Sequence, residues 1–292
     1  MNLNPIASHV QPIVDRHGIR EVMRRLRSAD RSIGLVPTMG AFHEGHLSLV
    51  RASVAAHDET IVTIFVNPSQ FGPTEDLDSY PRSLEQDLAE LKSLGVEHIF
   101  APSPEMMYPA AFSTYVQPPE VASRWEGTCR PGHFRGVTTV VLKLFNLIPA
   151  DVAFFGEKDY QQWLVIRRMV ADLDLRITLR LCPTIRDSDG LALSSRNRRL
   201  SLAHREQASA IPRALFRARE LFRQGERHPA AIEEAIHVVL RDAGVERLDY
   251  VAVVDPDTLR PLQYAHDAGR VIIAANVGGT RLIDNLQLGG VD

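Results

Sequence analysis

Two histidines stand close together in the segment PTMGAFHEGH, which spans residues 37–46 and follows a short apolar run. His43 and His46 are three residues apart, so they share a face where the segment opens a helix. The N-terminus of a helix offers unpaired N–H groups and a partial positive charge to an anion. Two imidazole donors there could stabilise charge growing on a phosphorus centre, which predicts a phosphate site. The alternatives are a pair of helix-capping histidines and a zinc pair, but the HExxH spacing and a third ligand are both missing.

A lysine provides the second candidate. The chain has 33 basic residues, of which only Lys92, Lys143 and Lys158 are lysines. Lys158 belongs to the segment GEKDYQQ (156–162), between an expected strand and an expected helix. A compact ammonium suits a phosphate as a point charge, the neighbouring Asp159 could accept from ribose hydroxyls, and Gln162 is expected to face the same side. The alternative is an N-capping acid beside a solvated lysine.

A third candidate is the segment DSDGLALSSRN (187–197). Ser194 and Ser195 offer two hydroxyls directly before Arg196, whose guanidinium can bind phosphate oxygens in a bidentate manner. Taken alone, such a run is also typical of a polar loop between domains.

Two further residues could bind smaller groups. Gln70 lies in FVNPSQFG (65–72), where an amide flanked by aromatic residues could orient a small polar ligand in an apolar pocket. Asp87, on the following expected helix, has the hard oxygen atoms that Mg²⁺ prefers, although a single helical aspartate is more often solvated.

The elements that must position these residues alternate between strand and helix. Apolar, β-branched runs predict strands at 32–37, 60–66, 97–101, 152–155 and 176–182. Helical spacing predicts helices at 16–28, 47–56, 83–94, 137–148 and 160–172, the third opened by a capping box of Ser83 and Gln86. This alternation predicts an α/β fold with a Rossmann-like parallel sheet, whose ligands bind at the carboxyl ends of the strands. The loops 37–46, 67–75, 156–159 and 183–196 should therefore lie on one rim.

The pattern changes near residue 185. Two long helices, at about 203–224 and 229–243, precede strands at 247–254, 270–275 and 280–284. Helices followed by strands predict a smaller α+β domain, so we expect a nucleotide-binding domain at 1–184 and a C-terminal lid domain at 185–292.

Composition excludes several classes of protein. Hydrophobic residues make up 45% of the chain, charged residues 24%, and the net charge is −3. Such a charge attracts neither nucleic acid nor an anionic membrane. Cys129 and Cys182 are the only cysteines, no apolar run is long enough to span a bilayer, and the first residues lack the apolar centre of a signal peptide. We therefore expect a cytoplasmic enzyme.

Five segments together resemble the pantoate–β-alanine ligase family of the nucleotidyl-transferase superfamily. They are PTMGAFHEGH, FVNPSQFGPTEDLDSYPR, RPGHFRGV, FGEKDYQQ and DGLALSSRN, in the order and spacing of that family. Phe42 and Leu193 depart from it, since leucine and methionine are usual there. Both substitutes are apolar, so we expect altered nucleotide packing rather than lost activity.

The resemblance implies that pantoate attacks ATP to form pantoyl adenylate and pyrophosphate, and that β-alanine then displaces AMP. It implies a homodimer, small-molecule substrates and a requirement for Mg²⁺, with Asp87 at the metal. The implied catalytic residues are His43, His46, Lys158, Ser194, Ser195 and Arg196. These also bind ATP, together with Pro37, Thr38, Met39, Gly40, Gly156 and Asp159. Gln70 and Gln162 are implied to bind pantoate, against an apolar wall of Val137, Val140, Val141 and Phe155.

Two other functions are compatible with the same motifs. A nucleotidyltransferase that leaves AMP on its product would need the same histidine site. A nucleotide-binding regulatory protein would have lost the catalytic groups, which the presence of His43, His46, Lys158 and Arg196 argues against.

Overall fold

The computed structural model describes residues 11–290 apart from 74, 76, 78–82 and 246. Much of the second half of the FVNPSQFGPTEDLDSYPR segment therefore lies outside the described residues.

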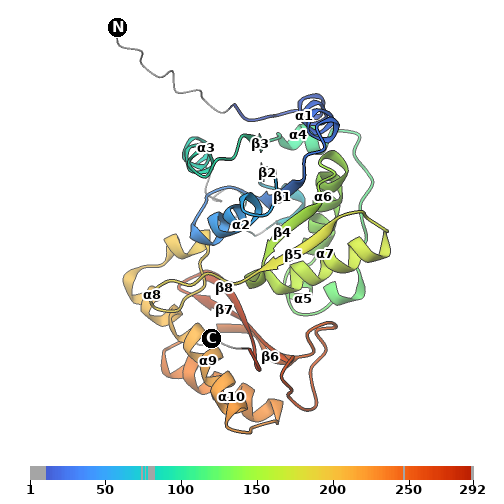
Figure 1. Ribbon diagram of the computed structural model, residues 1–292. Helices are drawn as coiled ribbons and strands as arrows, with labels where there is room; N and C mark the ends of the chain where they lie inside the picture. The colour runs from blue at the N-terminus through green and yellow to red at the C-terminus, as the bar shows by residue number, and fades with distance from the viewer. Residues whose placement is uncertain (1–10, 74, 76, 78–82, 246, 291–292) are drawn as a thin grey trace.

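The larger part of the chain is built on a parallel sheet of five strands, which confirms the predicted fold class (Figure 1). The strands stand in the order β3-β2-β1-β4-β5. Their bounds are β1 Ile33–Thr38, β2 Glu59–Ile64, β3 His98–Phe100, β4 Val152–Gly156 and β5 Thr178–Cys182. The chain thus moves from β1 outward to β3 on one side and returns to β4 and β5 on the other. Ligands of open α/β sheets bind where the strand order reverses, here between the carboxyl ends of β1 and β4.

Helices cover both faces of this sheet because successive strand residues point to opposite sides. Leu35 and Phe155 share a buried cluster with residues of the helices α1 Arg16–Ser28, α6 His133–Leu147 and α7 Tyr160–Asp172. Val36 and Phe154, one position away, share a second cluster with the helices α2 Glu44–Val54 and α3 Leu84–Ser93. The N-termini of α2 and α7 follow β1 and β4 directly or after one short turn, so both helices begin at the same edge of the sheet.

Short helical turns make up most of the remaining connections. They are α4 Pro104–Met107, α5 Glu126–Cys129, and the 3₁₀ turns η1 Pro68–Gln70, η2 Glu120–Ala122, η3 Glu157–Asp159 and η4 Ser195–Arg199.

The smaller part is an antiparallel sheet covered by helices, which agrees with the α+β prediction. Its elements are α8 Leu202–Ala208, α9 Ala210–Arg223, α10 Pro229–Asp242, β6 Arg247–Val254, β7 Arg270–Val277 and β8 Thr280–Gln287. Gly278 and Gly279 join β7 to β8 with φ of 55° and 80°, as a two-residue hairpin turn with positive φ requires. The helices pack on this sheet around their own buried cluster, which includes Ile211, Ile236 and Ile273.

Three local predictions were wrong. The helix expected at 203–224 is broken at Ser209, because Pro212 has no N–H for the carbonyl of Ala208 and its ring crowds that carbonyl. The helix expected from 137 begins at His133, after Gly132 in the left-handed conformation. Ser83 forms no capping box, because its hydroxyl donates to Asp87 Oδ1 at 3.2 Å.

Candidate active site

The four rim loops surround one cavity of about 220 Å³. It is lined by residues from 37–46, from the Asn67–Gln70 turn, from 156–159 and from 183–196, which confirms their predicted common rim. Its lining includes Thr38 at the end of β1 and Gly156 at the end of β4, where the strand order reverses. Among the predicted site residues it brings together Pro37, Thr38, Met39, His43, His46, Gln70, Val137, Val140, Val141, Phe155, Gly156, Lys158, Asp159, Gln162, Ser194, Ser195 and Arg196. Gly40 and Asp87 are the two predicted residues that do not line it.

The two histidines form a stacked pair at the start of α2. Their ring centroids are 4.0 Å apart with an interplanar angle of 26°. His43 is the N-cap residue, and its Nδ1 accepts a hydrogen bond from the Gly45 amide at 3.2 Å. A neutral ring that accepts at Nδ1 carries its proton on Nε2, which leaves His43 with one N–H donor away from the helix. His46 Nδ1 is buried and has no hydrogen-bond partner among the described residues.

Both imidazoles are neutral at physiological pH. Burial, the neighbouring ring of His46 and the charge of Lys158 lower the pKa of His43 to about 3. Burial and Lys158 lower the pKa of His46 to about 4. The two neutral rings and the positively charged Lys158 therefore form a site that attracts an anion. An anion placed among them would be bound by Lys158 and would itself raise the pKa of both rings.

Lys158 enters the cavity from η3, at the carboxyl end of β4. Its Nζ is 3.7 Å from Asp159 Oδ1. The backbone of this turn is held by the smaller sheet, because the Asn285 amide of β8 donates to the carbonyl oxygens of Glu157 at 3.0 Å and Lys158 at 2.9 Å. Arg270 of β7 adds an ion pair to Glu157 at 2.7 Å. The C-terminal sheet thus sets the position of the lysine.

The loop 183–196 contributes a further part of the lining of this cavity. Ser194 caps η4, where its hydroxyl accepts from the Arg196 amide at 3.3 Å. Arg198 NH2 donates to the carbonyl of Phe42 at 3.1 Å, which ties this loop to the histidine loop. The arrangement places Ser194, Ser195 and Arg196 around the same space as His43 and Lys158.

The part of the cavity lined by Gln70, Gln162 and apolar side chains suits a small acid with an apolar body. Gln70 is 9% exposed, its Oε1 accepts from Asn67 Nδ2 at 2.9 Å, and its Nε2 is 3.5 Å from Met39 Sδ. These contacts fix which end of the amide can donate. Gln162 has no side-chain hydrogen bond to any described residue, so its amide is available to a ligand. The wall between the two amides consists of the buried side chains of Val137, Val140, Val141 and Phe155.

Asp87, the predicted metal ligand, lies beneath the histidine loop, and its role at a metal stays a prediction. Its side chain is 1% exposed, and its two oxygens accept from the amides of Ala41 at 2.9 Å and Phe42 at 3.1 Å. Gly40 and Ala41 have φ of 81° and 52°, and a Cβ on Gly40 would lie 2.7 Å from Asp87 Oδ2. We therefore assign Asp87 to holding the loop that leads to His43. No group of three His, Cys, Asp or Glu side chains suited to a metal ion occurs in the described part of the chain.

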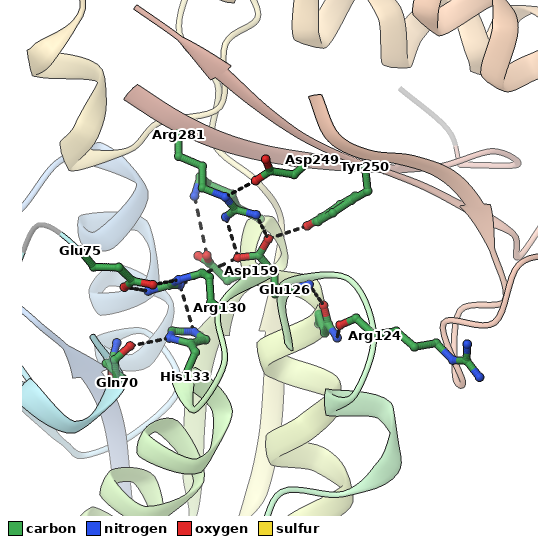
Figure 2. A network of polar contacts seen from close by, with 12 residues as sticks. Gln70, Glu75, Arg124, Glu126, Arg130, His133, Asp159, Asp249, Tyr250 and Arg281 are labelled. Carbon is green, nitrogen blue, oxygen red and sulfur yellow. Dashed lines mark hydrogen bonds and ion pairs between the residues drawn. The ribbon is translucent and has the colours of Figure 1, made fainter. Parts of the chain in front are cut away.

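A second cavity of about 570 Å³ opens beside the first, between the two sheets. The two share Met39, Gln70, Lys158, Asp159, Gln162, Ser194 and Arg196. A charged network crosses its wall, from Gln70 through His133 and Arg130 to Glu126, and on to Arg281 of β8 (Figure 2). Arg281 donates to both oxygens of Glu126, at 2.5 and 2.8 Å, and the Tyr250 hydroxyl donates to the same carboxylate at 2.8 Å. This network joins α5 and α6 of the larger part to β6 and β8 of the smaller sheet.

Sequence reasoning missed Asn67, His133 and Asn285. Asn67 and His133 belong to the FVNPSQ and RPGHFRGV segments, which carry the resemblance to the ligase family. The spacing of residues within these segments indicates no chemical role for either side chain. Asn285 acts on a turn 127 residues earlier, and its own surroundings in the sequence resemble any exposed strand.

A parallel sheet with reversed strand order, paired histidines at a helix start and an adjacent lysine define the class of nucleotide-binding enzymes that act at a phosphorus centre. The family model described as pantoate-beta-alanine ligase matches residues 12–287. The chain is 52% identical to pantothenate synthetase of Cereibacter sphaeroides over 262 residues, which cover 90% of this chain and 94% of that protein. The chain belongs to the pantoate–β-alanine ligase family, as its motifs predicted.

Solved structures agree with this membership. Pantothenate synthetase from Thermus thermophilus superposes with a TM-score of 0.91 at 44% identity, covering 96% of this chain and 100% of that chain. Pantoate-beta-alanine ligase from Francisella tularensis, in complex with beta-gamma ATP and beta-alanine, gives a TM-score of 0.78 at 34% identity, covering 96% and 99%. The predicted ligase activity and the pathway of pantothenate synthesis are thereby confirmed. No helix among the described residues combines the length and the apolar character needed to cross a membrane.

Proposed function

We propose that the chain joins pantoate to β-alanine in two half-reactions through a pantoyl adenylate. In the first, a pantoate carboxylate oxygen attacks the α-phosphorus of ATP, the bond to the β-phosphate oxygen breaks, and pyrophosphate leaves. In the second, the β-alanine nitrogen attacks the acyl carbon, the bond to the phosphate oxygen breaks, AMP leaves, and the nitrogen loses a proton. No protein nucleophile is needed, so the enzyme acts by positioning and by charge stabilisation.

The single observation that carries this proposal is that the groups suited to bind phosphate and the two amides suited to bind the acid line one cavity. His43, His46 and Lys158 line this cavity together with Gln70 and Gln162. An acid held by the amides would present its carboxylate to a phosphorus atom held by the imidazoles and the ammonium. A neutral imidazole can donate an N–H hydrogen bond to the extra negative charge that develops in the transition state. Because it carries no positive charge, it does not bind the ground-state phosphate equally strongly.

The remaining roles follow from where each group stands. Pro37, Thr38, Met39 and Gly40 lead from β1 into the histidine loop, and Gly156 leads from β4 to Lys158. We assign these segments to the nucleotide, with Asp159 accepting from the ribose hydroxyls. Ser194, Ser195 and Arg196 would contact the outer phosphates, which leave as pyrophosphate. The apolar wall of Val137, Val140, Val141 and Phe155 would face the methyl groups of pantoate.

We propose that Mg²⁺ enters as part of the substrate, bound to the phosphates of ATP. The support for this form is that Asp87 already has both oxygens hydrogen-bonded beneath the histidine loop. A hexacoordinate Mg²⁺ commonly keeps several waters and binds substrate phosphates with few protein ligands.

The competing function is a nucleotidyltransferase that retains AMP on its product. The wide cavity beside the acid pocket favours the ligase, because a second substrate needs access to the acyl carbon. The experiment is exchange of labelled pyrophosphate into ATP with β-alanine absent. Exchange that requires pantoate supports the adenylate, and release of free AMP after β-alanine is added separates the ligase from the transferase. Exchange without any acid would refute the proposed order.

The homodimer and the cytoplasmic location implied by the resemblance remain proposals. Sedimentation equilibrium of the purified chain, whose mass is 32.6 kDa, tests the first. Fractionation of the source cells tests the second.

A further inference from the structure

The turn that carries Gln70 rests directly on the first turns of α6. A Cβ on Gly136 of that helix would lie 2.3 Å from the Ser69 carbonyl oxygen and 2.6 Å from Gln70 Cα. The backbone of η1 and the backbone of α6 are therefore in contact, with no side chain between them. Asn67 Nδ2 adds a hydrogen bond to the Gly136 carbonyl at 3.2 Å.

His133, the first residue of α6, also contacts this turn. Its Nδ1 is 2.9 Å from the carbonyl oxygen of Gln70, and its Nε2 is 3.2 Å from Arg130 NH1. A carbonyl can only accept and a guanidinium can only donate, so the proton of the neutral ring must be on Nδ1. His133 thus donates to Gln70 and accepts from Arg130 (Figure 2).

The surroundings keep this ring neutral and in place. Burial and the charge of Arg130 lower the pKa of His133 to about 4. Glu75, Glu126 and the Gln70 carbonyl act in the opposite direction but are outweighed. Arg130 is itself fixed, because Glu75 accepts from its Nε at 2.8 Å and from its NH2 at 2.6 Å.

We propose that His133 is a positioning residue for the acid pocket, fixing the backbone of Gln70 so that its side-chain amide meets the pantoate. This inference rests on the proposed pantoate-binding role of Gln70. His133 lines the larger cavity but not the smaller one that contains the acid pocket, so we expect it to act on the acid through Gln70. Without its N–H, the buried carbonyl of Gln70 would have no donor from the ring, and the turn would lose a hydrogen bond to α6.

The test compares His133→Phe, which keeps a ring but no donor, with His133→Asn, whose Nδ2 can stand in for Nδ1. We expect His133→Phe to raise the KM for pantoate roughly tenfold while the KM for ATP stays within about twofold. His133→Asn should recover most of the pantoate KM, whereas His133→Gln, whose amide reaches too far, should not. His98→Phe is the matched control, because it removes another buried histidine, on β3, that lies outside both cavities.

A role confined to folding would give a different pattern. In a Gln70→Ala background, His133→Phe should add less than about twofold to the pantoate KM, since the side chain that it positions is gone. An equal loss in both backgrounds would overturn the inference, as would an unchanged pantoate KM in His133→Phe. An unchanged pantoate KM in Gln70→Ala alone would instead refute the proposed acid pocket. Should His133→Phe not fold, the comparison of His133→Asn with His133→Gln gives the same decision.

Discussion

Replacement of Gly136 by alanine tests how closely the acid pocket depends on α6. The added Cβ would lie 2.3 Å from the Ser69 oxygen, whereas ordinary van der Waals contact begins at 3.4 Å. The obstructing atoms are backbone, so η1 must move away by about 1 Å, and it carries Gln70 with it. A displacement of about 1 Å in a positioning group can lower a rate about 10²-fold.

The effect on stability should be much smaller. Overpacking costs about 1–3 kcal/mol, but alanine is favoured over glycine within a helix by roughly 1 kcal/mol. We therefore expect Gly136→Ala to fold with a free energy of unfolding lowered by at most about 2 kcal/mol, while pantoate-dependent pyrophosphate exchange falls about 10²-fold.

The matched control is Gly72→Ala, two residues beyond η1 on the same loop. A Cβ there would meet only the flexible Glu75 side chain, at 3.7 Å, so activity should stay within about twofold. Steady-state exchange at varied pantoate and urea unfolding measure the two effects separately. Wild-type exchange in Gly136→Ala would show that the contact between η1 and α6 does not position the acid.

Four other outcomes are expected. His46→Ala should lower the turnover of pyrophosphate exchange about 10²–10³-fold without loss of stability, and near wild-type exchange would contradict the phosphate assignment. Lys158→Arg should lower the same turnover about 10²-fold, because a longer planar fork misplaces the α-phosphorus, so unaltered exchange would mean that charge alone suffices. Asn285→Leu removes both donors from the η3 carbonyls, and kcat/KM for ATP should fall about tenfold or more, whereas an effect on pantoate alone would disprove the link. Burial would raise the pKa of Glu126, but its hydrogen bonds with arginine outweigh burial and lower that pKa below the ordinary 4.5. The contribution of the ionised Glu126 to stability is therefore complete above about pH 4.5 and is lost as the pH falls through the lowered pKa. We expect Glu126→Gln to lower the free energy of unfolding in urea by about 2 kcal/mol at pH 7, and this difference from the wild type should shrink in acid.

Local patterns in the sequence were enough for the sheet and for most of the site. β-Branched runs such as TIVTIFV can be satisfied only by burial on both faces, and alternation with helices then requires parallel strands. Parallel strands bring their carboxyl ends to one edge, so residues as distant as His43 and Lys158 could be expected to meet. The single helix expected at 203–224 was wrong, although Pro212 lies within that range and indicates a break. The helical spacing of the surrounding apolar residues favoured one continuous helix instead.

Asp87 shows what residue type alone leaves open. A carboxylate is equally suited to a metal ion and to a pair of backbone amides, and the sequence does not say which of them lies nearby. The amides of Ala41 and Phe42, 46 and 45 residues away, reach it only because Gly40 and Ala41 adopt positive φ.

The sequence by itself therefore determined which groups meet at the edge of the sheet, since this follows from strand order and from side-chain chemistry. Only the tertiary structure decided what holds those groups in place. The amide of Asn285 on the Lys158 turn, the ring of His133 on the Gln70 turn and the ion pair of Arg281 with Glu126 all join segments more than 60 residues apart. Such contacts depend on distances of a few tenths of an ångström between packed elements, and no periodicity or motif along the chain records them.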